Sequence, residues 1–399
     1  MDSKCAFFKA CLAFAALTII SSTRVAASFW VDNGERNLFN GVIFAYELNN
    51  YGDSGYREGV KWMFASFEDR TAKKLIPGQK HKIGVKIYTS SGDGIQTPLP
   101  LVRTVIDELE SRGYSRSDII IIDATESKMR DAGYLPPLSA RAEDRFDGVE
   151  VRYLDSGKWW NKTWFYDNPL PQSSVTDTNR QTLSNASAEN EEYRKSYLPA
   201  ALIEDVDFWI NLPCVMDNAA LEISGSLANA TLWNVSNRER FFNSPANAPV
   251  AMAEIAAIPE FLDSWALTIV SMERYQIVGG PIFNSNYVRG DPLLLGSSDP
   301  AILDAWAARR INAYRLIMGF KPLNSPPYAV SFARLVNVGA SDFDKIMWMT
   351  PKDTLPPEVA SHPDKVRDVE LSKPRRDTGI LIPVIPESAK HRHADEGDD

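Results

Sequence analysis

Two hydrophobic patterns follow one another in the first third of the chain. Residues 82–88 and 118–123 are rich in β-branched side chains, and the second run is unbroken between its aspartates, as in a parallel strand covered on both faces. Residues 99–112 place apolar side chains at every third or fourth position, which predicts a helix with Thr97 as N-cap and Pro98 as first helical residue. Strand, helix and strand in this order predict a right-handed βαβ unit.

The same patterns recur further along the chain. Apolar runs at 206–212, 265–270 and 292–295 predict three more strands. Helical spacing predicts helices over residues 55–70, 218–231, 250–264 with an interruption at Pro259, and 299–318. The alternation predicts an α/β fold with a mostly parallel sheet and flanking helices, in one large domain or two lobes.

Two segments lack such a pattern. Residues 155–197 are rich in Asn, Ser, Thr and Trp without a sustained period, so we expect a loop or β-rich insertion there. Residues 351–399 are rich in proline and charge and can bury little surface, which predicts a disordered tail. The sequence thus predicts an α/β domain over 28–350, interrupted by the insertion and followed by the tail.

The first 27 residues are typical of a targeting segment. Lys4 and Lys9 precede an apolar stretch over 10–20, and Val25-Ala26-Ala27 supplies small residues for cleavage. A bilayer-spanning helix needs about 20 apolar residues, so this stretch is short for a retained anchor, which is the alternative. We therefore expect a signal peptide cleaved after Ala27, a periplasmic or secreted protein, and no stable membrane anchor after processing.

The number of cysteines and the net charge limit which cofactors and partners the protein can have. Cys5 and Cys11 would leave with the signal peptide, so Cys214 alone can form neither an internal disulfide nor an iron–sulfur cluster, which needs about four thiolates. Processing also removes three basic residues and one acidic residue, and the formal net charge falls from −9 to −11. Such a surface disfavours nucleic acid. The histidines and cysteines lack the spacing of metal ligands, and no cofactor is identified.

An ordered series of short motifs spans about residues 80–320. It comprises Gly84-Val85-Lys86, Thr97-Pro98, Ile120-Ile121-Ile122-Asp123, Ile210-Asn211-Leu212-Pro213, Leu227-Ala228-Asn229, Arg238, Gly279-Gly280-Pro281 and Asp299-Pro300-Ala301-Ile302-Leu303-Asp304. In this order the motifs resemble the family called domain of unknown function 362. The resemblance implies an α/β fold but no defined activity.

The chain also departs from that family. Its members typically carry basic residues and a histidine after the Asn-Leu-Pro turn, where this chain has Cys214, Met216, Asp217 and Asn218. Some relatives carry a ferredoxin-like cluster module, for which this chain lacks cysteines. The resemblance therefore implies a divergent exported member without the cluster, whose anionic ligand or chemistry is altered or lost.

Open α/β sheets bind ligands at the carboxyl ends of their strands. Lys86, Asp123 and Asn211 lie at such ends, and the resemblance adds residues further along the chain. The candidate ligand-binding residues are Lys86, Asn211, Asn229, Arg238, Gly280 and Asp299, and the candidate catalytic residues are Asp123 and Asp304. Arg238 is the strongest anion-binding candidate, because its planar fork can hold a carboxylate or phosphate with two hydrogen bonds.

Each candidate also has a structural interpretation. Lys86 could be a solvated lysine, Asp123 a turn residue and Arg238 an ordinary surface arginine. Asp299 precedes Pro300 and is a strong N-cap candidate. Gly280 fits a tight turn.

Three functional hypotheses follow. The leading hypothesis is an exported protein that binds a small ligand in a crevice at the carboxyl ends of the strands. An anionic ligand is one option within this hypothesis. The second is an enzyme using Asp123 or Asp304 in acid–base chemistry. The third is a degenerate relative that acts as a cell-envelope interaction module, with Trp159, Trp160 and Trp164 as its contact surface.

Overall fold

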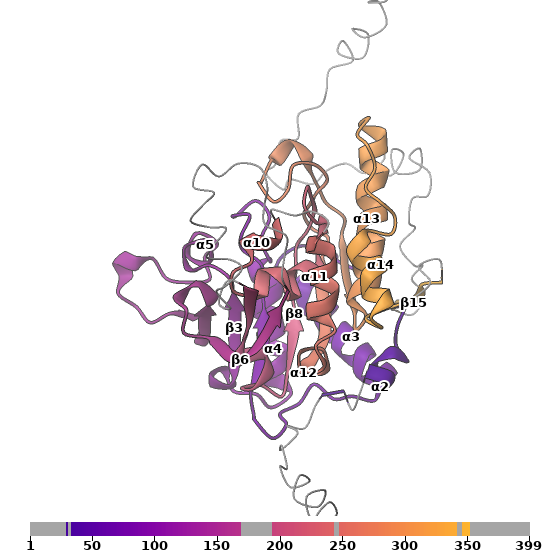
Figure 1. The fold of residues 1–399 in the computed structure, drawn as a ribbon. Coiled ribbons are helices and arrows are strands. Elements are labelled where there is room, and N and C mark those ends of the chain that lie inside the picture. Colours follow the sequence, from indigo (N-terminus) through magenta and orange to yellow (C-terminus); the bar gives the residue numbers. More distant parts are fainter. Residues whose placement is uncertain (1–28, 31–32, 169–193, 243–246, 341–344, 352–399) are drawn as a thin grey trace, which may run out of the picture.

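The structure is a computed structural model that describes residues 29–30, 33–168, 194–242, 247–340 and 345–351 (Figure 1). The predicted signal peptide and its cleavage site, residues 169–193 of the predicted insertion, and the predicted tail from residue 352 onward lie outside the described residues.

Nine strands of the described chain form one sheet, in the order β15-β1-β14-β11-β8-β2-β3-β5-β4. They are β1 (Val42–Glu47), β2 (Ile83–Lys86), β3 (Ile119–Asp123), β4 (Arg145–Phe146), β5 (Val149–Tyr153), β8 (Phe208–Asn211), β11 (Trp265–Ser271), β14 (Leu293–Ser297) and β15 (Met347–Met349). Only β14 and β4 run against the others. The predicted α/β fold with a mostly parallel sheet is confirmed.

Helices cover both faces of this sheet. They are α2 (Asn33–Asn37), α3 (Asp53–Thr71), α4 (Leu99–Ser111), α5 (Glu126–Asp131), α8 (Ala200–Ile203), α9 (Ser226–Ala230), α10 (Glu239–Phe242), α11 (Asn247–Ala256), α12 (Pro259–Ser264), α13 (Pro300–Ile317) and α14 (Tyr328–Leu335). Short 3-10 helices span Arg116–Asp118, Leu138–Ala140, Leu154–Ser156, Leu232–Asn234 and Ser285–Tyr287. Helices α11, α13 and α14 lie in front of the sheet in Figure 1, and α3 and α4 pack on the other face.

Strand β3 shows how the sequence produces these two layers. Successive side chains of a strand point to opposite faces. Ile119 and Ile121 accordingly enter the core under α3 and α4, whereas Ile120 and Ile122 enter the core under α11, α13 and α14. An unbroken apolar run is what a strand buried on both faces requires.

A smaller sheet extends from the carboxyl ends of the two central strands. It has the order β10-β9-β12-β13, with β9 (Val215–Asn218), β10 (Glu222–Ser224), β12 (Tyr275–Gln276) and β13 (Val288–Arg289). Strand β9 follows β8, and β12 follows β11, so two parallel neighbours of the large sheet continue as parallel neighbours of the small one. Strands β6 (Trp160–Asp167) and β7 (Lys195–Pro199) form a separate pair at the two ends of the predicted insertion.

The predicted helix over 218–231 is wrong. Residues 215–224 form the hairpin of β9 and β10, and only Ser226–Ala230 is helical. Asn218 accepts hydrogen bonds from the amides of Ala220 and Leu221, a local turn that competes with helix formation. Among the described residues, no helix combines the length and the apolar character needed to cross a membrane.

Candidate functional site

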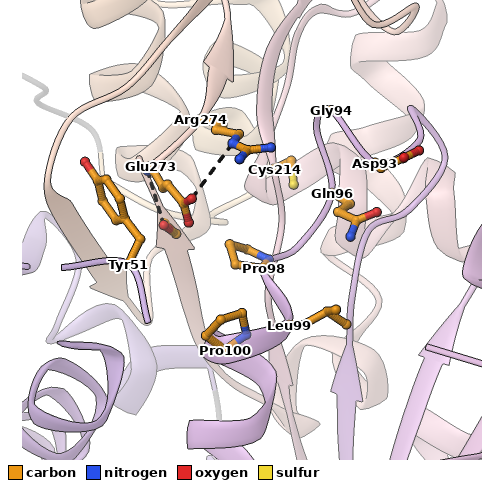
Figure 2. A pocket seen from close by; sticks show the side chains of 11 residues that line it. Tyr51, Asp93, Gly94, Gln96, Pro98, Leu99, Pro100, Cys214, Glu273 and Arg274 are labelled. Atoms are coloured by element: carbon orange, nitrogen blue, oxygen red, sulfur yellow. Dashed lines mark hydrogen bonds and ion pairs between the residues drawn. The ribbon is translucent and has the colours of Figure 1, made fainter. Parts of the chain in front are cut away.

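A cavity of about 220 Å³ lies at the carboxyl edge of the large sheet (Figure 2). Its walls come from the segments that follow four parallel strands. Tyr51 follows β1, residues 93–98 follow β2, Cys214 follows β8, and Glu273 and Arg274 follow β11. We call this cavity the edge pocket.

The amino end of helix α4 forms one wall of the edge pocket. Pro98, Leu99 and Pro100 line it and place apolar rings and methyl groups there. The N-cap is Pro98, not Thr97 as predicted from the sequence. The Thr97 hydroxyl instead donates to the Leu212 carbonyl at 2.6 Å and accepts from the Tyr88 amide at 2.8 Å. Thr97 thus joins the start of α4 to the ends of β2 and β8.

Glu273 is the half-buried carboxylate of the edge pocket. Its Oε2 accepts from the Tyr56 hydroxyl at 2.9 Å, and that hydroxyl lies 2.6 Å from Ser271 Oγ. Its Oε1 lies 3.8 Å from Arg274 Nε. Burial raises the pKa of Glu273 and also raises the pKa of Tyr51 to about 12.

Cys214 lies between the edge pocket and the interior. It is free and buried, as expected from the sequence for a small apolar side chain. Burial raises the pKa of its thiol, and the charges of Asp123 and Glu273 raise it further. The thiol therefore stays protonated, which disfavours a role as nucleophile.

Behind Cys214, Lys86 and Asp123 form an ion pair with no exposed surface on either side chain. Lys86 Nζ donates to Asp123 Oδ1 at 2.7 Å, to the Ile87 carbonyl at 2.7 Å and to Asn229 Oδ1 at 3.0 Å. Thr89 donates to the second Asp123 oxygen at 2.7 Å. All three ammonium hydrogens and both carboxylate oxygens are thus occupied. Burial lowers the pKa of Lys86, and Asp123 opposes that shift.

The same network continues across the neighbouring strand. Strand register places Lys86 beside Asn211, whose Oδ1 accepts from Asn229 Nδ2 at 2.8 Å and whose Nδ2 donates to the Ser226 carbonyl at 2.9 Å. Asp304 then accepts from the Ser226 and Leu227 amides at 2.6 and 2.9 Å and closes the amino end of α9. Burial raises the pKa of Asp304 to about 7, although the two amide donors oppose that shift.

Five of the eight candidates therefore lie together, in a closed hydrogen-bond network rather than on the wall of the edge pocket. These five are Lys86, Asp123, Asn211, Asn229 and Asp304. Each is at most 1% exposed. Lys86 is therefore not a solvent-exposed lysine, which was the alternative interpretation of this residue.

The other three candidates lie apart from this network. Asp299 is the N-cap of α13 and also accepts from the amides of Gly41 and Ala340. The Gly280 amide donates to Asp217 Oδ1 at 2.9 Å in a turn of the small sheet. Arg238 is partly buried against the Trp233 ring and makes a long hydrogen bond of 3.4 Å to Thr125. The expectation that the candidates other than Gly280 converge on one open crevice is therefore wrong.

A second cavity, of about 330 Å³, lies beside β4 and β5 at the edge of the sheet. It is rich in acidic side chains, but these are paired with neighbouring arginines. The pairs are Glu143 with Arg145, Asp144 with Arg130, and Glu150 with Arg152. Among the described residues, no three His, Cys, Asp or Glu side chains are arranged to hold a metal ion.

Sequence reasoning missed the principal polar residues of the edge pocket. Tyr51, Glu273 and Arg274 belong to none of the motifs of the chain. One signal was present, because Glu273 follows the predicted strand 265–270 within three residues, and polar groups just after buried strands collect at the carboxyl edge.

No protein-family model matches the chain, and no curated protein matches it. Among solved structures, the chain is similar to a protein from Thermotoga maritima with a TM-score of 0.34 and 10% identity. The alignment covers 62% of this chain and 56% of that one, so the likeness spans little more than half of the other protein. A similarity of this size carries no functional information, and the resemblance to the domain of unknown function 362 family stays a prediction.

Proposed function

We propose that the protein binds a small molecule in the edge pocket. The observation that carries this proposal is the convergence of the segments after β1, β2, β8 and β11 around one cavity. Open α/β sheets bind ligands at this edge, because loops from several strands can surround a ligand there without disturbing the sheet. A cavity of about 220 Å³ is smaller than most drug-sized sites and suits a small metabolite.

One part of the edge pocket favours an anionic group on the ligand. The Arg274 guanidinium lines it, with 40% of its side chain exposed. The amino end of α4, a helix of 13 residues, lies beside it, and no side chain caps the helix amides there. Helix amino ends and arginine both stabilise negative charge, so a carboxylate is the expected group in a cavity of this size.

The enzyme alternative finds less support. It assigned the base to Asp123 or Asp304, yet both carboxylates are buried and all their oxygens accept hydrogen bonds from the protein. A general base must reach the proton of a substrate. We therefore place binding ahead of catalysis.

The interaction-module alternative finds less support as well. Trp159, Trp160 and Trp164 pack partly buried against the core. Arg152 lies 4.3 Å from the Trp159 ring, and the Trp164 indole donates to Glu204 at 3.1 Å. These side chains already have partners within the chain, which leaves less of their surface for another protein.

Native mass spectrometry of the full-length protein, expressed with its natural amino terminus and purified gently, tests the proposal. We expect excess mass that disappears on denaturation, and a mature chain that begins at Ser28. Titration with pentanoate should then raise the melting temperature of the apo protein. Arg274→Gln should lower the affinity for pentanoate about five-fold or more, whereas the control variant Arg57→Gln, at an exposed arginine, should not change it.

A clean apo mass, together with no melting shift from a panel of small acids, amines and neutral metabolites, would overturn the binding proposal. Equal pentanoate binding by the wild type and Arg274→Gln would refute the anionic contact alone.

A further inference from the structure

The charges of the edge pocket are mixed. Glu273 and Arg274 lie on one side of the cavity and Asp93 on the other, above the apolar residues of α4 (Figure 2). Two carboxylates and one guanidinium give this site a net negative charge, which a purely anionic ligand would not match. The ligand must therefore offer more than an acidic group.

Glu273 is held in one orientation by the protein. The Tyr56 hydroxyl of α3 donates to Oε2 at 2.9 Å and is itself fixed by Ser271 at 2.6 Å. Only 17% of the Glu273 side chain is exposed. One carboxylate oxygen is thus anchored, and this fixes the direction in which the other points.

The other oxygen, Oε1, accepts no hydrogen bond from a described residue. Its nearest partner in the described part of the chain is Arg274 Nε at 3.8 Å, which is too long for a hydrogen bond. Partial burial raises the free energy of the Glu273 carboxylate by removing water from it, and the raised pKa of Glu273 has the same cause. An ammonium group bound at Oε1 would offset that cost.

A second acceptor of the same cavity is unsatisfied too. The Gln96 side chain donates from Nε2 to the Ala132 carbonyl at 3.1 Å, which leaves its Oε1 facing elsewhere. That oxygen is buried and has no hydrogen-bond partner among the described residues. Two acceptor oxygens of residues that line the edge pocket thus lack a hydrogen-bond donor among the described residues, which favours a ligand that carries an N–H group.

We infer that the ligand of the edge pocket is a small α-amino acid with an apolar side chain, whose ammonium group is bound by Glu273. An α-amino acid carries opposite charges on adjacent groups, as Glu273 and Arg274 do on the protein. Its ammonium would bind Glu273 Oε1 and its carboxylate would lie toward Arg274 and the amino end of α4. Its side chain would pack on Pro98, Leu99 and Pro100. This inference rests on the proposed binding function and names its ligand class.

Three matched probes test the inference by isothermal titration calorimetry on the full chain. Norvaline carries both charged groups, pentanoate lacks the amino group, and butylamine lacks the carboxylate. We expect norvaline to bind at least about ten-fold more tightly than either of the others. Glu273→Gln should weaken norvaline binding by a similar factor and should not weaken pentanoate binding, because it removes a negative charge near the ligand carboxylate.

Glu58→Gln is the matched control, because Glu58 also accepts from a tyrosine hydroxyl but is exposed on α3. Norvaline affinity should not change in this variant. Glu273→Asp is the second test variant, in case Glu273→Gln does not fold. Aspartate keeps the negative charge, but its side chain is one methylene shorter, so the carboxylate lies farther from the ligand. This variant should also bind norvaline more weakly.

Each outcome has a separate meaning. Equal affinities for norvaline and pentanoate, unaffected by Glu273→Gln, would overturn the amino-acid inference and leave the binding proposal standing. Butylamine binding as tightly as norvaline would overturn the amino-acid class in favour of a simple amine. No binding of any probe, with excess mass present in the native spectrum, would overturn the inference alone, whereas a clean apo mass as well would overturn both proposals.

Discussion

At the scale of single residues, Lys86 and Asp123 each depend on the other, because a buried charge needs a partner of opposite charge. Removing one partner leaves the other charge buried without compensation, whereas removing both leaves only polar neighbours to satisfy. We expect Lys86→Met to lower the free energy of unfolding by about 3–5 kcal/mol. The double variant Lys86→Met/Asp123→Asn should lose clearly less free energy of unfolding than the two single variants lose together. Urea unfolding of the four proteins of this cycle measures the coupling, and additive effects would contradict the ion pair.

Asp304 makes the stability of the protein depend on pH. Burial raises the folded-state pKa of Asp304 to about 7, well above the ordinary aspartate value of about 3.9. The folded chain therefore binds a proton that the unfolded chain releases. The resulting stability is fully present below the unfolded pKa and is lost as the pH rises through 7.

We expect the wild type to lose about 2–3 kcal/mol between pH 5 and pH 8 relative to Asp304→Asn, whose amide does not titrate in that range. Urea midpoints measured at intervals of half a pH unit test this expectation. Parallel pH profiles of the two proteins would show that the Asp304 carboxyl does not titrate in this window.

At the level of elements, Thr97 couples helix α4 to the strand ends that surround the edge pocket. Its hydroxyl joins the Tyr88 amide and the Leu212 carbonyl, and both groups are buried. Thr97→Val keeps the shape but leaves both groups unsatisfied, which should cost about 1–3 kcal/mol. The change should also weaken ligand binding, because it loosens the α4 wall of the pocket.

Thr104→Val is the control for this prediction. Thr104 lies in the same helix, but its hydroxyl donates to the Pro100 carbonyl within that helix. Thermal unfolding and ligand titration of both variants should separate them. Equal losses in the two variants would mean that the link from Thr97 to β8 does not matter.

At the scale of the whole molecule, the segment before β1 is part of the core. Trp30 has no exposed surface, and its indole donates to the Trp265 carbonyl at 3.1 Å. Arg36 of α2 donates to the carbonyls of Leu262 and Trp265 at 2.7 Å each, and to that of Ser298. One buried guanidinium thus joins α2 to α12, β11 and the segment before α13.

Arg36→Met should therefore lower the free energy of unfolding by at least about 3 kcal/mol, because it removes three buried hydrogen bonds donated by a charged group. The exposed Arg57→Met should change it by less than about 1 kcal/mol. Chemical denaturation of both variants makes the comparison. A small effect of Arg36→Met would show that the amino-terminal segment detaches without disturbing the sheet.

The edge pocket also depends on the whole molecule. Tyr51 and Glu273 lie far apart in the sequence and meet there only because β1 and β11 are both antiparallel neighbours of β14. No local pattern contains this strand order. Sequence reasoning therefore pointed to this edge of the sheet, but none of its eight candidate residues lines the cavity.

The sequence by itself determined much of the local structure, although not the hairpin over residues 215–224. The structure agrees with three sequence predictions: the buried strand β3, the amphipathic helix α4 and the Asp299 cap of α13. Burial on one or two faces requires a periodic or continuous apolar pattern, and helix capping requires a particular residue at one position, so both can be identified in the sequence. Tertiary structure decided which polar groups meet. Strand register placed Lys86 beside Asn211 and closed their network, whereas the strand order opened the edge pocket around Glu273. Pairing between distant strands depends on long-range packing, which no short segment encodes.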